Sequence, residues 1–311
     1  MTLSKFLDPK NDVAFKRLFG SEDHKDILIH FINDILELKD NNQIEDVEFL
    51  LPIQNLEIAS KKQSIVDVLC KDKNDVQIIV EMQVSPTRGF EKRAQYYAAK
   101  AYSRQLNSGA EEKYINLKEI IFIAIADHKL FPEKKAYKSN HIILDKKSYE
   151  HDLKDFSFTF IELPKFKKEK IEELKDITEK WIYFFKYAQK TSEGDLKRLI
   201  GSDIVIKTAY EALNRFNWNE NELIQYDQSE KRLRDYIASM DYQYDKGIQK
   251  GIAQGREEGI EKGIQKGMQK GIENEKLQTA KNMLARGLDV DLISDVTGLP
   301  KSEIKKLESI R

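Results

Sequence analysis

The sequence predicts an α/β fold whose elements run helix, three strands, helix, strand, followed by added helices and a C-terminal helical arm. Apolar residues recur at helical spacing over 11–38 and 89–107. They alternate with polar residues between 44 and 84, and they form a short continuous run at 119–126. Because both periods occur in one stretch of chain, an all-α or all-β fold is excluded.

The first helical stretch contains Gly20 and Ser21, which should divide it into two helices with Ser21 capping the second. The stretch 89–107 returns to helical spacing and is followed by Gly109. The run 119–126 suits a central strand buried on both faces. A further strand pair is expected at 140–144 and 156–163, and 169–239 again has helical spacing.

Composition limits the function classes. Of 311 residues, 40% are hydrophobic and 34% charged, which is typical of a soluble globular protein with one large or two smaller domains. The net charge of -1 means that any basic surface for nucleic acid must be local. Cys70 is the one cysteine, so an intramolecular disulfide and a Cys₄ or Cys₂His₂ zinc site are excluded.

The amino-terminal residues show no apolar signal-peptide region, and the longest strongly apolar run, 120–126, is too short to cross a bilayer. We therefore expect a cytoplasmic protein without a membrane partner. The five histidines show no metal-binding spacing, and neither a P-loop nor a GxSxG nucleophile motif occurs.

Two strands, 64–70 and 76–84, flank a polar turn at 71–75 and predict a β-hairpin. If 73–75 form the loop, residue 72 opposes 76, and Asp67 opposes Glu81. Directly opposed Cβ atoms lie ~4.5–5.5 Å apart, and two carboxylates at that distance repel unless a cation lies between them. Glu81 also interrupts an apolar run, which is costly unless it is paired or binds a metal.

A divalent ion held by such a pair suits phosphodiester hydrolysis, because it activates water and stabilises the charge that develops on phosphorus. Gln83 follows two residues after Glu81, on the same face of the strand. Its amide can orient the attacking water or contact the phosphate, but it cannot act as a general base.

Asp67 followed by Glu81-Met82-Gln83 resembles the D…(D/E)-x-K signature of the PD-(D/E)XK nuclease superfamily, with Gln in place of the last Lys. Together with residues 11–20 (NDVAFKRLFG), residues 79–83 (IVEMQ) and a glycine-repeat tail, this is similar to the Rpn family of recombination-promoting nucleases or transposases. The resemblance implies a restriction-endonuclease-like core and a Mg²⁺-dependent DNA endonuclease, with Mn²⁺ as an alternative ion, in DNA recombination or mobile-element biology.

The resemblance also implies roles for individual residues. Asp67 and Glu81 would bind Mg²⁺, Gln83 would replace the lysine, and Asp12 would be an accessory acid near the metal. The helix after the hairpin would contact DNA through Arg93, Gln95 and Tyr97. Asp12 has a rival role as a helix N-cap before Val13, and Arg93 and Tyr97 also fit a solvated face or the core.

A second function of a different class stays open, namely a non-catalytic relative that binds DNA and oligomerises. The intact acid pair favours the enzyme. The sequence does not indicate a DNA sequence preference, one-strand or two-strand cleavage, or the oligomer size.

The C-terminal arm repeats glycine at every fourth residue from Gly247 to Gly271, often followed by Ile or Met. In a helix this places a glycine groove beside an apolar ridge. Seven interior glycines cost roughly 7 kcal/mol relative to alanine, so close packing in a homo-oligomer would compensate, with right-handed wrapping. A flexible linker is the alternative.

Residues 278–286, 290–296 and 301–307 have the spacing of a small helix-turn-helix module, in which Pro300 or Ser302 starts the last helix. Whether it reads DNA stays open. We therefore expect a nuclease domain with a helical extension at 1–240, a Gly-x-x-x helix or linker at 241–275, and a helical module at 276–311.

Overall fold

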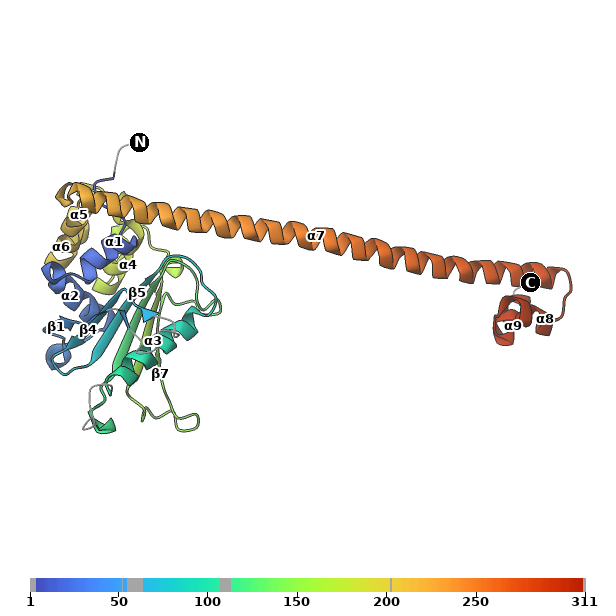
Figure 1. Ribbon diagram of the computed structural model, residues 1–311, viewed down its shortest axis with the longest axis horizontal. Helices are drawn as coiled ribbons and strands as arrows, with labels where there is room; N and C mark the ends of the chain where they lie inside the picture. The colour runs from blue at the N-terminus through green and yellow to red at the C-terminus, as the bar shows by residue number, and fades with distance from the viewer. Residues whose placement is uncertain (1–3, 52, 55–63, 107–112, 202, 310–311) are drawn as a thin grey trace. The chain divides into compact units, whose positions relative to one another are not determined.

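The computed structural model describes residues 4–51, 53–54, 64–106, 113–201 and 203–309. The chain forms two compact units, Met1–Asp235 and Tyr236–Arg311 (Figure 1). The α-helices are α1 (Asp12–Phe19), α2 (Lys25–Leu36), α3 (Phe90–Arg104), α4 (Ile177–Tyr187), α5 (Glu193–Ile200), α6 (Ile204–Ala212), α7 (Glu220–Ala285), α8 (Val290–Thr297) and α9 (Lys301–Ser309). None of the helices in the described residues is long and apolar enough to span a membrane.

The first unit is built on a six-stranded sheet in the order β1-β4-β5-β6-β8-β7. Its strands are β1 (Val47–Phe49), β4 (Val68–Asp72), β5 (Gln77–Gln83), β6 (Ile120–Ala126), β7 (Lys138–Ile142) and β8 (Phe156–Glu162). β1, β4 and β5 form the expected antiparallel meander, and β5, β6 and β8 are parallel neighbours. A small separate ribbon pairs β2 (Ile53–Gln54) with β3 (Ser64–Ile65).

The central strand β6 divides the core into two layers, because alternate side chains point to opposite faces of a sheet. Phe122 and Ala124 pack with the buried alanines of α3 on one face. Ile123 and Ile125 pack with α1, α2, α4 and α6 on the other. Figure 1 shows α3, the connection between β5 and β6, running across the sheet. The result is a three-layer arrangement, and it confirms the α/β fold class that the sequence predicts.

The break in the first helical stretch is confirmed, since α1 ends at Phe19 with Gly20 as its C-cap. Two capping predictions were wrong. Ser21 caps a short 3₁₀ helix (Glu22–His24) instead of α2, because three residues intervene before α2 begins. The N-cap of α1 is Asn11, whose Oδ1 accepts a hydrogen bond from Val13 N at 2.9 Å, so Asp12 is the first helical residue.

The predicted strand 64–70 is interrupted at Val66 and Asp67, and β4 begins only at Val68. The other predicted strands and the helix 89–107 correspond to β5, β6, β7, β8 and α3. Gly109, expected after α3, lies outside the described residues.

The second unit contains most of α7, then α8 and α9. Ala280, Ile293, Leu299 and Ile304 form its buried core. Gly298 ends α8 in the left-handed conformation (φ +68°), which glycine adopts without strain. Pro300 directly precedes α9, and its carbonyl accepts a hydrogen bond from Ile304 N at 3.2 Å. The helix therefore starts immediately after Pro300, and Ser302 already lies within it.

Candidate active site

The β4–β5 hairpin has the predicted register. Leu69 pairs with Ile79 and Val68 with Val80, which places Asp67 opposite Glu81. The turn is tight because Asp72 N donates to Val76 O at 3.0 Å, while Asp72 Oδ1 accepts from Asn74 N and Val76 N. The three-residue loop 73–75 assumed from the sequence is therefore the one observed.

Asp67 and Glu81 lie side by side where β4 begins. Asp67 Oδ2 accepts a hydrogen bond from Met82 N at 2.8 Å, and Glu81 Oε2 accepts one from Asp67 N at 3.2 Å. These carboxylates satisfy backbone N–H groups in the place of strand ladder bonds. This explains why the strand pairing stops at this point and why the predicted strand 64–70 is broken.

Glu81 is buried, Asp67 is half-buried, and their negative charges repel each other. Glu81 is 6% exposed. Burial raises the pKa of both carboxyls, and the neighbouring charge of Asp67 raises the pKa of Glu81 further. A pair of this kind is most stable when a cation lies beside it, because opposite charge favours the ionised carboxylates.

Helix α3 brings one such cation. Alternation along β5 places Ile79, Glu81 and Gln83 on the face that packs against α3, where Ile79 contacts the α3 core. Arg93 of α3 lies there, with Nη2 at 3.6 Å from Glu81 Oε1 and donating a hydrogen bond to Gln83 Oε1. Sequence reasoning expected Arg93 to contact DNA but did not anticipate its contact with the acid pair.

Gln83 is held at both ends of its amide. Its Nε2 donates to Ser85 O at 2.5 Å and to Thr87 Oγ1 at 3.1 Å, and its Oε1 accepts from Arg93. These contacts fix which way the amide points.

Helix α1 supplies two more charges. Asp12 lies close enough to raise the pKa of Asp67, and Lys16 lowers the pKa of both Asp67 and Glu81. Lys16 and Asp12 also form an ion pair at 2.7 Å. Sequence reasoning missed Lys16. Its position four residues after Asp12, on the same helix face, was the available signal.

Tyr97 and Gln95, the two other residues of α3 that were predicted to contact DNA, differ in their surroundings. Tyr97 is half-buried, and burial raises its pKa, while the nearby positive charge of Arg93 lowers it. The Arg93 guanidinium lies over the Tyr97 ring at 5.9 Å. Gln95 is exposed and donates to Glu91 O of its own helix at 3.0 Å, so the structure does not bring it to the acid pair.

The donor set fits a hard divalent cation. Mg²⁺ prefers oxygen ligands and is commonly held by one or two carboxylates, with water and phosphate oxygens filling its other positions. Asp67 and Glu81 provide two carboxylates. Within the described part of the chain, no group of three or more His, Cys, Asp or Glu side chains is arranged to hold a metal ion.

Two protein-family models match the chain. The model of the PD-(D/E)XK nuclease family transposases matches residues 9–243. The chain belongs to this family. A second model, the C-terminal helix-turn-helix domain of the Rpn/YhgA-like nuclease family, matches residues 273–309. Neither a curated protein nor a solved structure matched the chain.

The two matches confirm the resemblance to the Rpn family and the PD-(D/E)XK fold class. They also assign α8 and α9 to a helix-turn-helix domain.

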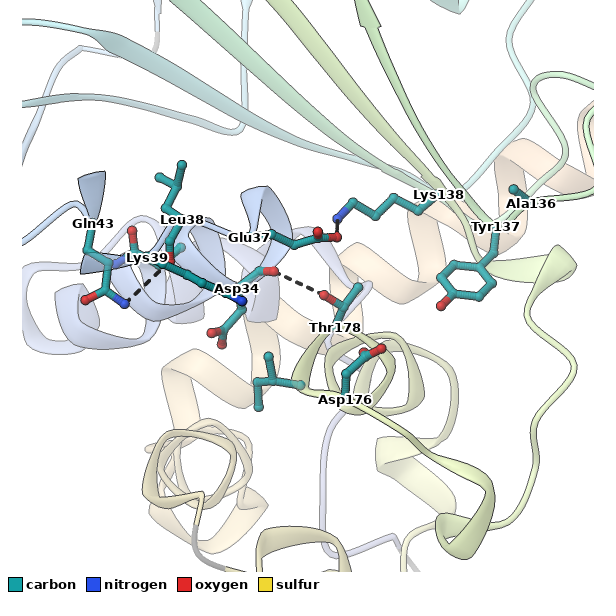
Figure 2. A pocket seen from close by; sticks show the side chains of 12 residues that line it. Asp34, Glu37, Leu38, Lys39, Gln43, Ala136, Tyr137, Lys138, Asp176 and Thr178 are labelled. Atoms are coloured by element: carbon teal, nitrogen blue, oxygen red, sulfur yellow. Dashed lines mark hydrogen bonds and ion pairs between the residues drawn. The ribbon is translucent and has the colours of Figure 1, made fainter. Parts of the chain in front are cut away.

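The nuclease unit also carries a cavity of about 760 Å³ between the end of α2, the start of α4 and the residues around Tyr137 (Figure 2). An ion pair between Lys138 and Glu37 at 2.6 Å and a hydrogen bond from Thr178 Oγ1 to Asp34 O at 3.1 Å cross it. None of its lining residues belongs to the acid pair or its neighbours.

Proposed function

We propose that this Rpn nuclease is a Mg²⁺-dependent DNA endonuclease that hydrolyses phosphodiester bonds, with Mn²⁺ able to replace Mg²⁺. The observation that carries the proposal is the pair of Asp67 and the buried Glu81, which lie opposite each other at the β4–β5 hairpin and resemble the acidic positions of the D…(D/E)-x-K signature. We also propose a role in DNA recombination or mobile elements, because the matching family model describes transposases of the PD-(D/E)XK nuclease family.

In this proposal Asp67 and Glu81 hold the metal through their carboxylate oxygens. The bound ion supplies a more acidic water and offsets the negative charge that builds up on the phosphate. Asp12, whose charge adds to the effect of burial on the pKa of Asp67, would be the accessory acid. Burial raises the pKa of both carboxyls, and Lys16 and Arg93 oppose this only in part, so a bound divalent ion would supply the remaining positive charge that favours the ionised carboxylates.

The test is nicking of supercoiled plasmid DNA with Mg²⁺ and with EDTA. We expect the wild type to nick only with Mg²⁺, and Asp67→Asn and Glu81→Gln to lose at least about 100-fold in rate, since each removes a metal-binding charge. Glu48→Gln is the matched control, because Glu48 is an exposed acid on the neighbouring strand β1. Nicking retained in both site variants would reject the proposal.

The second candidate is a non-catalytic relative that binds DNA and oligomerises. The observation that favours it is Gln83, which lacks the positive charge of the signature lysine. Wild-type protein that binds duplex DNA but never nicks it, with either Mg²⁺ or Mn²⁺, would support this candidate over the enzyme.

We also propose that DNA contacts the helix-turn-helix domain and that α7 mediates homo-oligomerisation. A Cβ built on each of the seven repeat glycines meets no atom within 4 Å. The apolar residues beside them are exposed: Ile248, Ile252, Ile260, Ile264, Met268 and Ile272. Among the described residues, no contact compensates for the free-energy cost of placing these glycines in a helix. Packing against a second copy of α7 would compensate for it.

A further inference from the structure

We propose that Arg93 is the cation that meets the scissile phosphate, and that Gln83 is a positioning residue that holds the Arg93 guanidinium beside Glu81. This inference rests on the proposed endonuclease function and deepens it by assigning the positive charge of the site to a residue of α3. It also gives Gln83 a role other than orienting water.

The geometry around the guanidinium carries the proposal. Arg93 Nη2 donates to Gln83 Oε1 and lies 3.6 Å from Glu81 Oε1. The contact with Glu81 is too long to be a tight bidentate ion pair, which has N···O distances of ~2.7–2.9 Å. The guanidinium is therefore held near the acids without being saturated by them.

The stem of Arg93 is fixed while part of its charge stays accessible. Its guanidinium carbon lies 4.9 Å from the Phe90 ring centre and 5.9 Å from that of Tyr97. The side chain is 31% exposed, so it can reach a ligand. Its Nε is buried and has no hydrogen-bond partner among the described residues.

Gln83 has one orientation available. Because Ser85 O and Thr87 Oγ1 both contact its Nε2, the oxygen of the amide must face Arg93. A planar guanidinium with several donors matches phosphate oxygens, and a fixed cation near the reacting phosphate stabilises charge that develops in the transition state. The contacts of Gln83 thus direct Arg93 toward the place where a phosphate beside Glu81 would lie.

This arrangement makes a specific rescue test possible. Gln83 Oε1 already touches Arg93 Nη2, so a lysine at position 83 would place its ammonium at the same end of the acid pair. We expect Arg93→Ala to lower the plasmid nicking rate about 10²–10³-fold, as is typical when a preorganised charge-stabilising donor is lost. We expect the double variant Arg93→Ala/Gln83→Lys to recover at least 10-fold of that loss.

Two further measurements separate catalysis from folding. Mn²⁺ affinity, followed by calorimetry, should change less than about threefold in Arg93→Ala. Affinity for a duplex, measured with Ca²⁺ to prevent cleavage, should fall, and its slope against salt should decrease by ~0.9, the value for one lost phosphate contact. Lys92→Ala, which removes an exposed charge next to Arg93, is the control and should retain wild-type nicking.

The outcomes are distinguishable. If the wild type nicks DNA and Arg93→Ala is equally active, the inference about Arg93 is overturned and the proposed endonuclease function stands. Loss of nicking together with loss of Mn²⁺ binding, without rescue by Gln83→Lys, assigns Arg93 a structural role and also overturns it. If the wild type does not nick, the proposed function fails, and the salt slope of Arg93→Ala then decides whether Arg93 contacts phosphate.

Discussion

Glu81 shows how one side chain in an unfavourable position can identify a site. A carboxylate that is 6% exposed, next to a second acid, costs free energy unless a cation compensates for it. The protein offers only partial compensation, through Arg93 at 3.6 Å and the more distant charge of Lys16. The remaining repulsion favours binding of a divalent ion.

The pH dependence of stability tests this view. Burial raises the pKa of Glu81 and Asp67 above their unfolded values, so the folded state binds more protons, and stability falls as pH rises from about 4 to about 8. In EDTA at pH 8, Glu81→Gln should melt about 3 °C or more above wild type, which corresponds to roughly 1 kcal/mol for a domain of this size.

The difference should shrink at pH 5, which lies below the folded-state pKa of both carboxyls, because Glu81 and Asp67 are then protonated in the folded protein. Mg²⁺ should raise the melting temperature of the wild type at pH 8 and leave that of Glu81→Gln nearly unchanged. Scanning calorimetry at the two pH values measures all of these. A Glu81→Gln variant that is less stable than wild type at pH 8 would contradict the account.

The sequence was sufficient to place Asp67 opposite Glu81, because the register follows from the length of one local loop. It was not sufficient to place Lys16 or Arg93 at the pair. The spacing of Asp12 and Lys16 places these two residues on one helix face, but the approach of α1 and α3 to the hairpin is a tertiary property that local spacing does not encode.

At the scale of elements, α7 is unusual because it is a helix of 66 residues that contains seven glycines at four-residue spacing. Four residues of an α-helix advance ~400°, so the glycine column turns ~40° around the axis at each repeat. A straight partner helix cannot follow all seven positions, whereas a partner that wraps in the right-handed sense can.

Substituting glycines tests whether they pack against a second copy. Gly255→Ala/Gly259→Ala/Gly263→Ala should stabilise the isolated helix by ~3 kcal/mol, or ~1 kcal/mol at each position. If the glycines allow close approach, the same variant should weaken self-association at least 10-fold, measured by sedimentation equilibrium. Gln254→Ala, at an exposed position of the same helix, is the control. If self-association of the variant is unchanged or tighter, the glycines do not pack against a second copy, and the repeat is interpreted as a linker.

The order of the core elements was predictable because each has a strong local period, as the buried run of β6 and the alanine face of α3 illustrate. The β2–β3 ribbon was not predicted. The break before β4 was not predicted either, since it arises from side chains that replace backbone partners, and periodicity does not register such contacts.

At the scale of the whole molecule, the chain combines two parts that point to DNA. The nuclease family match covers 9–243 and the helix-turn-helix match covers 273–309. The glycine repeat lies largely between the matched ranges. We infer that cleavage and DNA binding are separable, with the proposed metal site in the first unit and the helix-turn-helix domain in the second.

A lysine of α9 tests that separation. Lys305→Gln, at an exposed position, should lower duplex affinity and reduce its salt slope by ~0.9, if this lysine neutralises one phosphate. Mn²⁺ affinity should stay at the wild-type value. Lys281→Gln on α7 serves as the control for loss of surface charge. Fluorescence anisotropy over a salt series measures the slope, and an unchanged slope would remove α9 from the DNA interface.

The most direct test of the central claim is anomalous diffraction from crystals soaked in Mn²⁺. The account predicts one strong peak ~2.2 Å from a carboxylate oxygen of Asp67 and from one of Glu81, a distance typical of oxygen ligands to a small divalent ion, and no such peak in Glu81→Gln crystals. A wild-type map with manganese bound elsewhere, or with none at the two acids, would contradict it.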